Sequence, residues 1–490
     1  MISNFKIILI AVAVSLSSFS AELSEEASPS SFFWSVSDHA LVSSAKDPAE
    51  PETPAKNVFS HQTSVGVGYE NISTEVLFTN RFSQTRDPLV DQPFLLDKKS
   101  LVGDFENWEF RIGDSHQELG RGIALALFNN PAFGVDNTLE GGSLKYRDDF
   151  VEVSAFGGRV NALQAPVAIN PIDTLMSSRE VKIAGGALSG HFGSQVKGTA
   201  HYHLTSSQPD GKAINRKYQT LGASLEARDV LSGVDAYWES NVMDWESTNS
   251  SKPLQKKPRA YANFGSLSYS DSVFKSKLEF KDYRSFFYEF QGPPTLEEEI
   301  VLSTNNSDVT AARFLTEGRV GYEGQATLGS SFLYGQDREL KAKIYHPLAF
   351  SKWKVSSGVE LEARGGYRWM PDKNNLVHGS LKSKFKTGRG EYFELEFRKQ
   401  TLNQAITSPI PIHEERNAAL GTYTFSGSFS LGLGYEYMPT NLPEQGNHFV
   451  NGTATYKTGV IAARGFVGQT SGGTQCSSGV CRQVPPFSVS

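Results

Sequence analysis

Apolar and polar residues alternate along most of this chain from about residue 57 onward. Residues 353–369, 377–386, 393–398 and 429–437 carry apolar side chains at every second position, with polar or charged ones between them. Successive side chains of a β-strand point to opposite faces, so a period of two predicts strands with one apolar and one polar face. The segments run to about nine to thirteen residues, the length that a tilted strand needs to cross a bilayer, whereas strands of soluble sandwiches are usually about five or six residues long.

Together these segments predict an all-β protein, a transmembrane antiparallel β-barrel over residues 57–490. The same alternation recurs at 64–80, 106–113, 150–159, 194–205, 217–228, 232–245, 258–270, 272–284, 312–323, 325–336, 446–457 and 459–469. We expect ~16–20 strands, with about 18 as the central value. The short turns near residues 268–272, 386–391 and 456–459 would face the periplasm. The longer polar links 81–105, 161–179, 286–311 and 402–414 would lie outside the cell or fold into the lumen.

The two ends of the chain depart from this alternation. Residues 1–20 hold Lys6, an apolar run of about ten residues and a small-residue exit, which predicts a secretory signal peptide cleaved before Ala21 rather than a membrane helix of about twenty residues. Residues 21–56 are acidic and rich in Pro and Ser, so we expect a disordered periplasmic leader that a periplasmic partner could bind. The aromatic patch 32–34 could dock this leader against the barrel. The chain ends in Ser490 and not in the aromatic residue that barrel-assembly machinery usually reads, so either the closing strand is short or the sequence is truncated.

Composition and motifs narrow the chemistry. A net charge of −6 without a clustered basic stretch argues against a nucleic-acid partner. The only cysteines, Cys476 and Cys481, predict a local disulfide in an exported chain, and no Cys-x-x-Cys-His motif is present for a c-type haem. The sequence lacks Gly-x-Ser-x-Gly, His-Glu-x-x-His and a phosphate-cradling loop, so we expect neither an enzyme nor a cofactor. His201 and His203 share one strand face, but two ligands do not complete a metal site.

Charged residues on the polar faces of three successive strands are the first candidate site. Their sign alternates from strand to strand, and opposite charges facing each other across strands stabilise a sheet. A charge that faced lipid at mid-depth would cost about 2–4 kcal/mol, so we expect these side chains to point into the lumen. There they would either set ion selectivity or merely keep the wall rigid. The set is Glu360, Glu362 and Arg364, then Lys382, Lys384 and Lys386, then Glu394, Glu396 and Arg398, with a similar pattern in Lys275, Lys277, Glu279 and Lys281 and in Arg313, Glu317, Arg319 and Glu323.

The second candidate site lies where two glycines flank Arg121. In a regular strand Arg121 would share a face with apolar neighbours, so we expect a β-bulge at Gly120 and Gly122 that turns the arginine inward. There it could meet Asp114 or Asp136 near a constriction. Arg111, in the preceding strand, joins the predicted pore lining.

The runs Gly113-Asp114, Gly120-Arg-Gly122 and 136–141 (Asp-Asn-Thr-Leu-Glu-Gly) resemble an early-strand signature of porin-like outer-membrane β-barrels of Gram-negative bacteria. They are more distantly similar to the early strands of alginate-export-type porins. The resemblance implies a monomeric barrel in the outer-membrane lipid that passes solutes. We therefore predict a channel for passive passage of small hydrophilic or charged solutes. The alternative is an occluded barrel that acts as a structural or interaction scaffold, including a sheath around a separate electron-transfer partner.

Overall fold

The computed structural model describes residues 11–16, 32–45, 56–83, 92–130, 135–163, 178–207, 214–249, 252–256, 259–286, 308–321, 325–338, 341–371, 374–388, 390–404, 412–425, 428–439, 448–458, 461–470, 473–477, 480–484 and 487–489. Within these ranges the regular elements are β-strands, which confirms the predicted all-β class. No helix among these residues is long and apolar enough to cross a membrane.

The strands are numbered in chain order. The first half holds β1 (Ala11–Leu16), β2 (Phe32–Ala45), β3 (Lys56–Tyr69), β4 (Ile72–Ser83), β5 (Gln92–Phe105), β6 (Trp108–Ser115), β7 (Gln117–Leu119), β8 (Leu125–Leu127), β9 (Asn129–Asn130), β10 (Val135–Asp136), β11 (Leu139–Arg147), β12 (Val151–Leu163), β13 (Ser178–Phe192), β14 (Val196–Ser207), β15 (Ile214–Ala227) and β16 (Val234–Asn249). The second half holds β17 (Lys252–Lys256), β18 (Ala260–Ser270), β19 (Phe274–Arg284), β20 (Val309–Val320), β21 (Ala326–Asp337), β22 (Ala342–Ser356), β23 (Val359–Met370), β24 (Asn374–Lys386), β25 (Tyr392–Gln404), β26 (Ile412–Phe425), β27 (Phe429–Tyr437), β28 (His448–Thr458), β29 (Ile461–Thr470), β30 (Gly473–Ser477), β31 (Val480–Val484) and β32 (Phe487–Val489).

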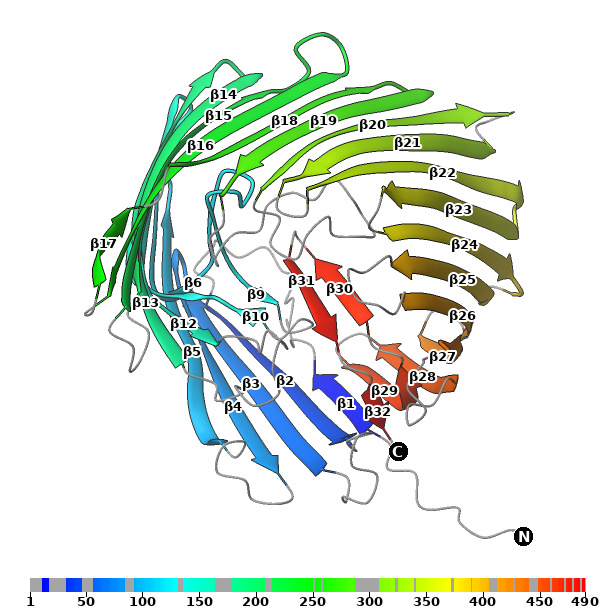
Figure 1. Ribbon diagram of the computed structural model, residues 1–490. Coiled ribbons are helices and arrows are strands. Elements are labelled where there is room, and N and C mark those ends of the chain that lie inside the picture. The colour runs from blue at the N-terminus through cyan, green and yellow to red at the C-terminus, as the bar shows by residue number, and fades with distance from the viewer. Residues whose placement is uncertain are drawn as a thin grey trace, which may run out of the picture.

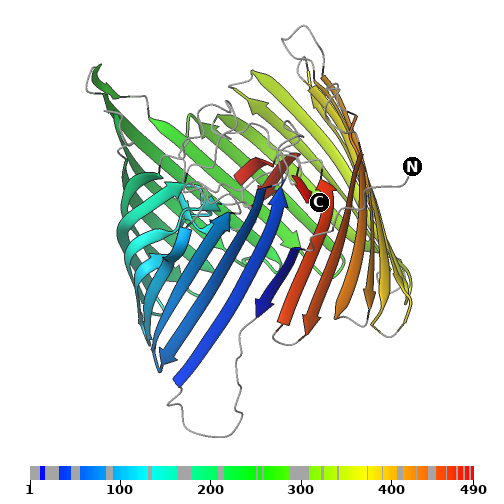
Figure 2. The same cartoon turned by 90° about the horizontal axis from the view of Figure 1, so that it is seen from below.

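One large antiparallel sheet of 26 strands accounts for most of the chain. In the described ranges β17 and β32 each pair with one strand, and the remaining 24 strands each pair with at least two neighbours. The sheet curves round on itself, so that β1 pairs with both β2 and β29 (Figure 1). We call this ring of strands the barrel. The view turned by 90° shows its long strands inclined across the wall (Figure 2).

The sequence analysis undercounted these strands, because 24 lie in the ring against an expected 18. Strand β13 carries the stretch Ala-Gly-Gly-Ala, and small residues give little contrast between faces. Strand β5 contains a register shift against β4 that interrupts its alternation. Strand β5 was therefore assigned to the polar link 81–105, and residues 180–192 of β13 were not predicted as a strand.

Strand β2 corrects the predicted leader. It lies inside residues 21–56 and pairs with β3 along its whole length, so Phe32–Ala45 belongs to the sheet. Strand β1 lies inside the predicted signal peptide, and it fills the place between β2 and β29. Because β1 is antiparallel to both neighbours, β2 and β29 run in the same direction. Strand β32 also pairs antiparallel with β29, at Gly468–Thr470.

The outer face of the barrel is apolar. Large exposed side chains such as Leu221, Leu225, Leu278, Phe314 and Leu433 occupy alternate positions on the face opposite to the buried core. Exposed aromatic side chains lie beside the short turns, among them Tyr69, Trp108, Phe150 and Phe192.

Two short turns are held by the same arrangement. The carboxylate of Asp148 accepts hydrogen bonds from the backbone N–H groups of Phe150 and Val151, and Asp271 does the same for the residues that follow it. In each case these backbone donors are the main cause that lowers the pKa of the aspartate.

The inside of the barrel is partly filled by the chain between β6 and β11. Figure 1 places β9, β10, β30 and β31 within the ring. Strands β7 and β8 form a small separate hairpin, and its apolar side chains join those of the wall in one buried cluster. We call residues 116–130 and 135–138 the infolded segment. The core of this protein therefore lies within the barrel, between this segment and one side of the wall.

Candidate functional site

The infolded segment turns sharply at the two glycines that flank Arg121. Gly120 and Gly122 have φ values of +65° and +74°, in the left-handed region that favours glycine. They lie in the turn between β7 and β8 rather than in a strand, so the predicted bulge is wrong. The physical reason is that two left-handed residues close together close a hairpin, whereas a bulge needs only one extra residue.

Glu239 of β16 holds this turn against the wall. Its carboxylate is fully buried and accepts hydrogen bonds from the backbone N–H of Arg121 at 3.0 Å, the Tyr237 hydroxyl at 2.6 Å and the Asn241 amide at 2.8 Å. A Cβ atom at Gly120 would lie only 1.9 Å from Oε1 of Glu239. Gly120 is therefore required both for its backbone conformation and for its close approach to the carboxylate.

The Arg121 side chain lies along the inner wall. Its guanidinium carbon is 3.8 Å from the centre of the Tyr237 ring and 5.9 Å from that of Phe264, and Nη1 is 3.5 Å from the Ser266 hydroxyl. A cation over an aromatic face is stabilised most when it is shielded from water. These contacts hold the positive charge of Arg121 against the inner wall of the barrel.

Apolar side chains anchor the rest of the infolded segment. Leu119, Ile123, Leu125 and Leu127 are each at most 4% exposed and pack in one cluster with wall residues. Glu118, next to this cluster, has a pKa raised above its ordinary value, first by burial and then by the charge of Glu239. The Glu118 side chain nevertheless remains exposed to solvent, so its ionisation opposes docking only weakly.

The structure gives other partners to the residues predicted to meet Arg121. The carboxylate of Asp114 accepts the backbone N–H of Lys99 at 2.7 Å and lies 3.7 Å from Nζ of Lys98. Asp136 pairs with Asn129 through its backbone, and its side chain lies outside the described residues. Arg111 lies 3.9 Å from Glu109 on the same strand.

The structure brings the predicted charge ladder together on the inner face of β22–β25. Glu360 stands opposite Lys384, and Glu362 stands opposite Lys382. On the next strand Lys382 stands opposite Glu396 and Lys384 opposite Glu394. Nζ of Lys382 is 2.9 Å from the Glu394 carboxylate, so the ion pairs also reach diagonally.

Strand β22 extends the ladder by two cations that the predicted site did not include. Lys352 stands opposite Glu362, and Lys354 stands opposite Glu360. A pocket between these strands is lined by Lys352, Glu360, Glu362, Lys382, Lys384 and Glu394. The signal was available in the sequence, because both lysines share the alternation of the strand that precedes Glu360.

The remaining ladder residues lie at the margins of this pocket. Arg398 is paired with Glu396 of its own strand at 2.5 Å. Arg364 stands opposite Ser380, and the backbone N–H of Lys386 donates to the Gly358 carbonyl in the adjoining short turn.

A second charged group covers β19 and β20. The carboxylate of Glu279 is 4% exposed and pairs with Lys277 at 2.7 Å and with Arg313 at 2.5 Å. Lys275 lies 4.0 Å from Glu317. Arg319 donates to the Ser272 carbonyl in the neighbouring turn, and Glu323 lies outside the described residues. Glu279 is the buried member of this group, whereas Lys275 and Arg319 are exposed.

Histidines on the inner face form pairs rather than clusters. Nε2 of His346 lies 2.8 Å from Nε2 of His378, across Gly366 of the strand between them. His201 contacts Asn241 at 2.8 Å. In the described part of the chain no three His, Cys, Asp or Glu side chains come together as a metal site. Cys476 and Cys481 are directly opposed in β30–β31, and their side chains lie outside the described residues.

No protein-family model and no curated protein sequence matches this chain. Among solved structures it is similar to OccK11 (OpdR) of Pseudomonas aeruginosa, with a TM-score of 0.41 and 11% identity over 88% of this chain and 96% of that chain. It is also similar to OccK5 (OpdH) of the same organism, with a TM-score of 0.39 and 10% identity over 88% of this chain and 98% of that chain. The copper transporter OprC gives a TM-score of 0.40 and 10% identity over 99% of this chain and 80% of that chain. No link to alginate-export porins is shown, and the function of this chain is inferred from its own residues.

Proposed function

We propose that this protein is an outer-membrane channel for passive passage of small hydrophilic or charged solutes. The observation that carries the proposal is the contrast between the two faces of β22–β25. The outer face exposes Trp353, Leu381 and Phe397, while the inner face holds the paired, mostly half-buried charges of the ladder. Charges at this density are stable in water and costly in lipid, so the inner face is wet if the outer face meets the membrane.

The infolded segment gives the channel its restriction. It occupies one side of the interior and carries Arg121, while the ladder lines the wall that the buried apolar cluster leaves exposed. A solute would therefore pass between a fixed guanidinium on one side and alternating carboxylates and ammonium groups on the other. Such a passage favours small polar molecules over apolar ones.

Proteoliposome swelling tests this function directly. Vesicles containing the refolded full-length chain should swell in iso-osmotic small sugars and amino acids, and they should not swell in a dextran too large to enter. Planar-bilayer recordings of the same preparation should show steady single-channel currents. No swelling and no current, from protein shown to be folded and inserted, would refute the channel.

The second candidate is an occluded barrel that serves as a scaffold. The observation that favours it is the apolar cluster inside the barrel, which buries Leu119, Ile123, Leu125 and Leu127 against the wall. The same bilayer experiment separates the two, because a scaffold would insert and remain silent.

A further inference from the structure

The charge ladder surrounds a small cavity on the inner face of the barrel, with a volume of about 150 Å³. The described residues that line it include three lysines and three glutamates from four neighbouring strands. These are Lys352 of β22, Glu360 and Glu362 of β23, Lys382 and Lys384 of β24, and Glu394 of β25. We call this cavity the ladder pocket.

The sign of the charge changes from each strand to the next around the ladder pocket. Glu362 stands opposite Lys352 on one side and opposite Lys382 on the other. Glu360 stands opposite Lys384 in the same way. We call the like charges of one strand a column. Neighbouring strands lie ~4.8 Å apart, so a solute at this wall meets a positive and a negative column together.

Most charges of the ladder pocket have room for a further partner. Among the residues that the structure describes, one ion pair joins two members of the pocket, Lys382 and Glu394 at 2.9 Å. Lys352 and Glu362 are both exposed, and within the described part of the chain they stand opposite each other without a direct ion pair. Their charged groups are therefore accessible to a solute.

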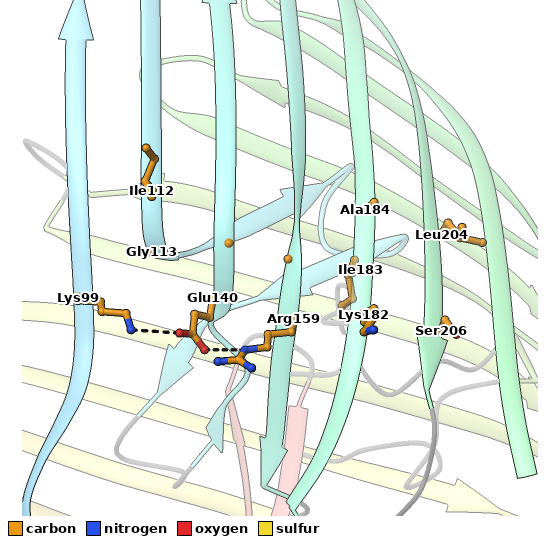
Figure 3. A pocket seen from close by; sticks show the side chains of 12 residues that line it. Lys99, Ile112, Gly113, Glu140, Arg159, Lys182, Ile183, Ala184, Leu204 and Ser206 are labelled. Atoms are coloured by element: carbon orange, nitrogen blue, oxygen red, sulfur yellow. Dashed lines mark hydrogen bonds and ion pairs between the residues drawn. The ribbon is translucent and has the colours of Figure 1, made fainter. Parts of the chain in front are cut away.

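Charges on the outer face of the barrel show the opposite arrangement (Figure 3). Glu140 points outward, because its neighbour Leu139 is fully buried in the interior cluster. Its carboxylate lies 3.3 Å from Nζ of Lys99 and accepts a hydrogen bond from Nε of Arg159 at 2.9 Å. There the protein itself supplies both cationic partners of the carboxylate, whereas Glu362 in the ladder pocket lacks such a contact among the described residues.

An alternating wall selects solutes by the arrangement of their charges. A simple anion that approaches a lysine column also approaches the carboxylates of the next strand, so attraction and repulsion largely cancel. A zwitterion can place each of its charges against a column of the opposite sign. The ammonium nitrogen and the carboxyl carbon of an α-amino acid are ~2.5 Å apart, and a hydrogen bond of ~2.8 Å at each end extends its reach to ~8 Å. Adjacent columns lie within this reach.

We infer that the ladder pocket binds small zwitterions of the α-amino-acid class. Glu360 and Glu362 accept hydrogen bonds from the ammonium group of the solute, and Lys352 donates to its carboxylate. Because each contact needs a charge of one sign at its own place, the selectivity does not depend on the net charge of the wall. Passage of the bound solute rests on the proposed function, whereas binding in the pocket does not require that the barrel conducts.

Saturation-transfer NMR with two isomers tests this site. Alanine is a zwitterion and lactamide is its uncharged isomer, so the two solutes have the same atoms and nearly the same size. Both are added to one sample of the detergent-solubilised full-length chain. We expect about tenfold more saturation of the alanine methyl group, the equivalent of ~1.4 kcal/mol, because charge-assisted hydrogen bonds are roughly twice as strong as neutral ones.

Three double variants identify the groups that bind. Lys352→Gln/Glu362→Gln removes one charge of each sign, leaves the net charge unchanged, and should lower the alanine signal to that of lactamide. Lys352→Arg/Glu362→Asp keeps both signs and should retain most of the preference, which separates a loss of charge from a loss of structure. The matched control Lys399→Gln/Glu415→Gln removes an ion pair of 3.0 Å on the outer face and should keep the wild-type preference.

Equal saturation of alanine and lactamide by the wild-type protein would overturn the inference, and so would an unchanged preference in Lys352→Gln/Glu362→Gln. Proteoliposome swelling in the same two solutes tests passage separately. A preference for alanine in detergent without swelling in either solute would refute the channel and leave the binding site intact. Swelling in both solutes without any binding preference would refute the site and leave the channel intact.

Discussion

Release of the infolded segment should widen the channel, and two of its buried anchors give the means to test this. Ile123 and Leu125 are both fully buried in the interior cluster. We expect the double variant Ile123→Asp/Leu125→Asp to detach the segment from the wall. The barrel itself should remain, because its strands pair through backbone hydrogen bonds that the variant does not touch.

The magnitude follows from the burial. Four apolar side chains anchor the segment, and each contributes ~1.5–3 kcal/mol when fully buried, or ~6–12 kcal/mol together. The double variant removes about half of this and adds two buried carboxylates, each of which costs several kcal/mol without a partner. The two remaining anchors, the Arg121 N–H bond to Glu239 and the cation–π contact supply ~3–6, ~1.5–3 and ~2 kcal/mol. The two buried carboxylates cost about as much, and ordering the segment costs ~1–2 kcal/mol per residue in addition, so the docked position is no longer favoured.

Two assays report the release independently. Single-channel conductance should rise, and trypsin should cleave after Arg121, which is held against Tyr237 in the wild-type protein. The volume-conserving variant Ile123→Leu/Leu125→Ile should behave as wild type, since such exchanges usually cost less than ~1.5 kcal/mol. If the Asp variant folds, inserts, and keeps both the wild-type conductance and the protection of Arg121, the apolar anchors do not hold the segment.

Three further predictions concern the pH dependence of Glu118 and Asp148 and the pairing of β29 with β1 and β32. Because the pKa of Glu118 is raised in the docked segment, docking should strengthen as pH falls toward that pKa, so conductance should decrease in mild acid, and Glu118→Gln should abolish this pH dependence. The pKa of Asp148 is lowered, so its contribution to stability is present above its ordinary pKa and is lost as pH falls through the lowered value. The difference in unfolding free energy between wild type and Asp148→Asn should therefore vanish in strong acid and persist at pH 7. Mass spectrometry of the exported protein should show a chain that starts at Ala21 and therefore lacks β1. We expect β32, which already pairs with one end of β29, to extend along the edge of β29 that β1 would leave open. Hydrogen exchange should then show the β29 amides still protected, and rapid exchange along β29 would contradict this replacement.

The charge ladder could be predicted from the sequence because its alternation is local. Glu360, Glu362, Lys382 and Lys384 lie on consecutive strands joined by short turns, so hairpin register alone brings them opposite each other. The same reasoning found the all-β class. It undercounted the strands where small residues or a register shift weakened the alternation, as in β13 and β5.

The anchor of the infolded segment could not be found in this way. The bond between Arg121 and Glu239 joins residues 118 positions apart, and no local pattern links them. The paired glycines around Arg121 did mark an unusual backbone, but they fit a bulge as well as a turn. The contact of the Arg121 backbone with Glu239 of β16 favours the turn over the bulge. Alternation of polar and apolar residues carries no information about such a long-range contact. Strand β2 was missed for a related reason, since its pairing with β3 and not its own composition makes it a strand.

The reversal potential of the single channel in a salt gradient tests the central claim most directly. The variant Lys382→Gln/Lys384→Gln/Lys386→Gln removes three positive charges from the ladder and should shift selectivity toward cations. Glu394→Gln/Glu396→Gln removes the two carboxylates that stand opposite Lys384 and Lys382, and it should shift selectivity toward anions. Opposite shifts of the reversal potential would show that ions pass along this wall. Unchanged reversal potentials in both variants, with wild-type folding and insertion, would contradict a channel lined by the ladder.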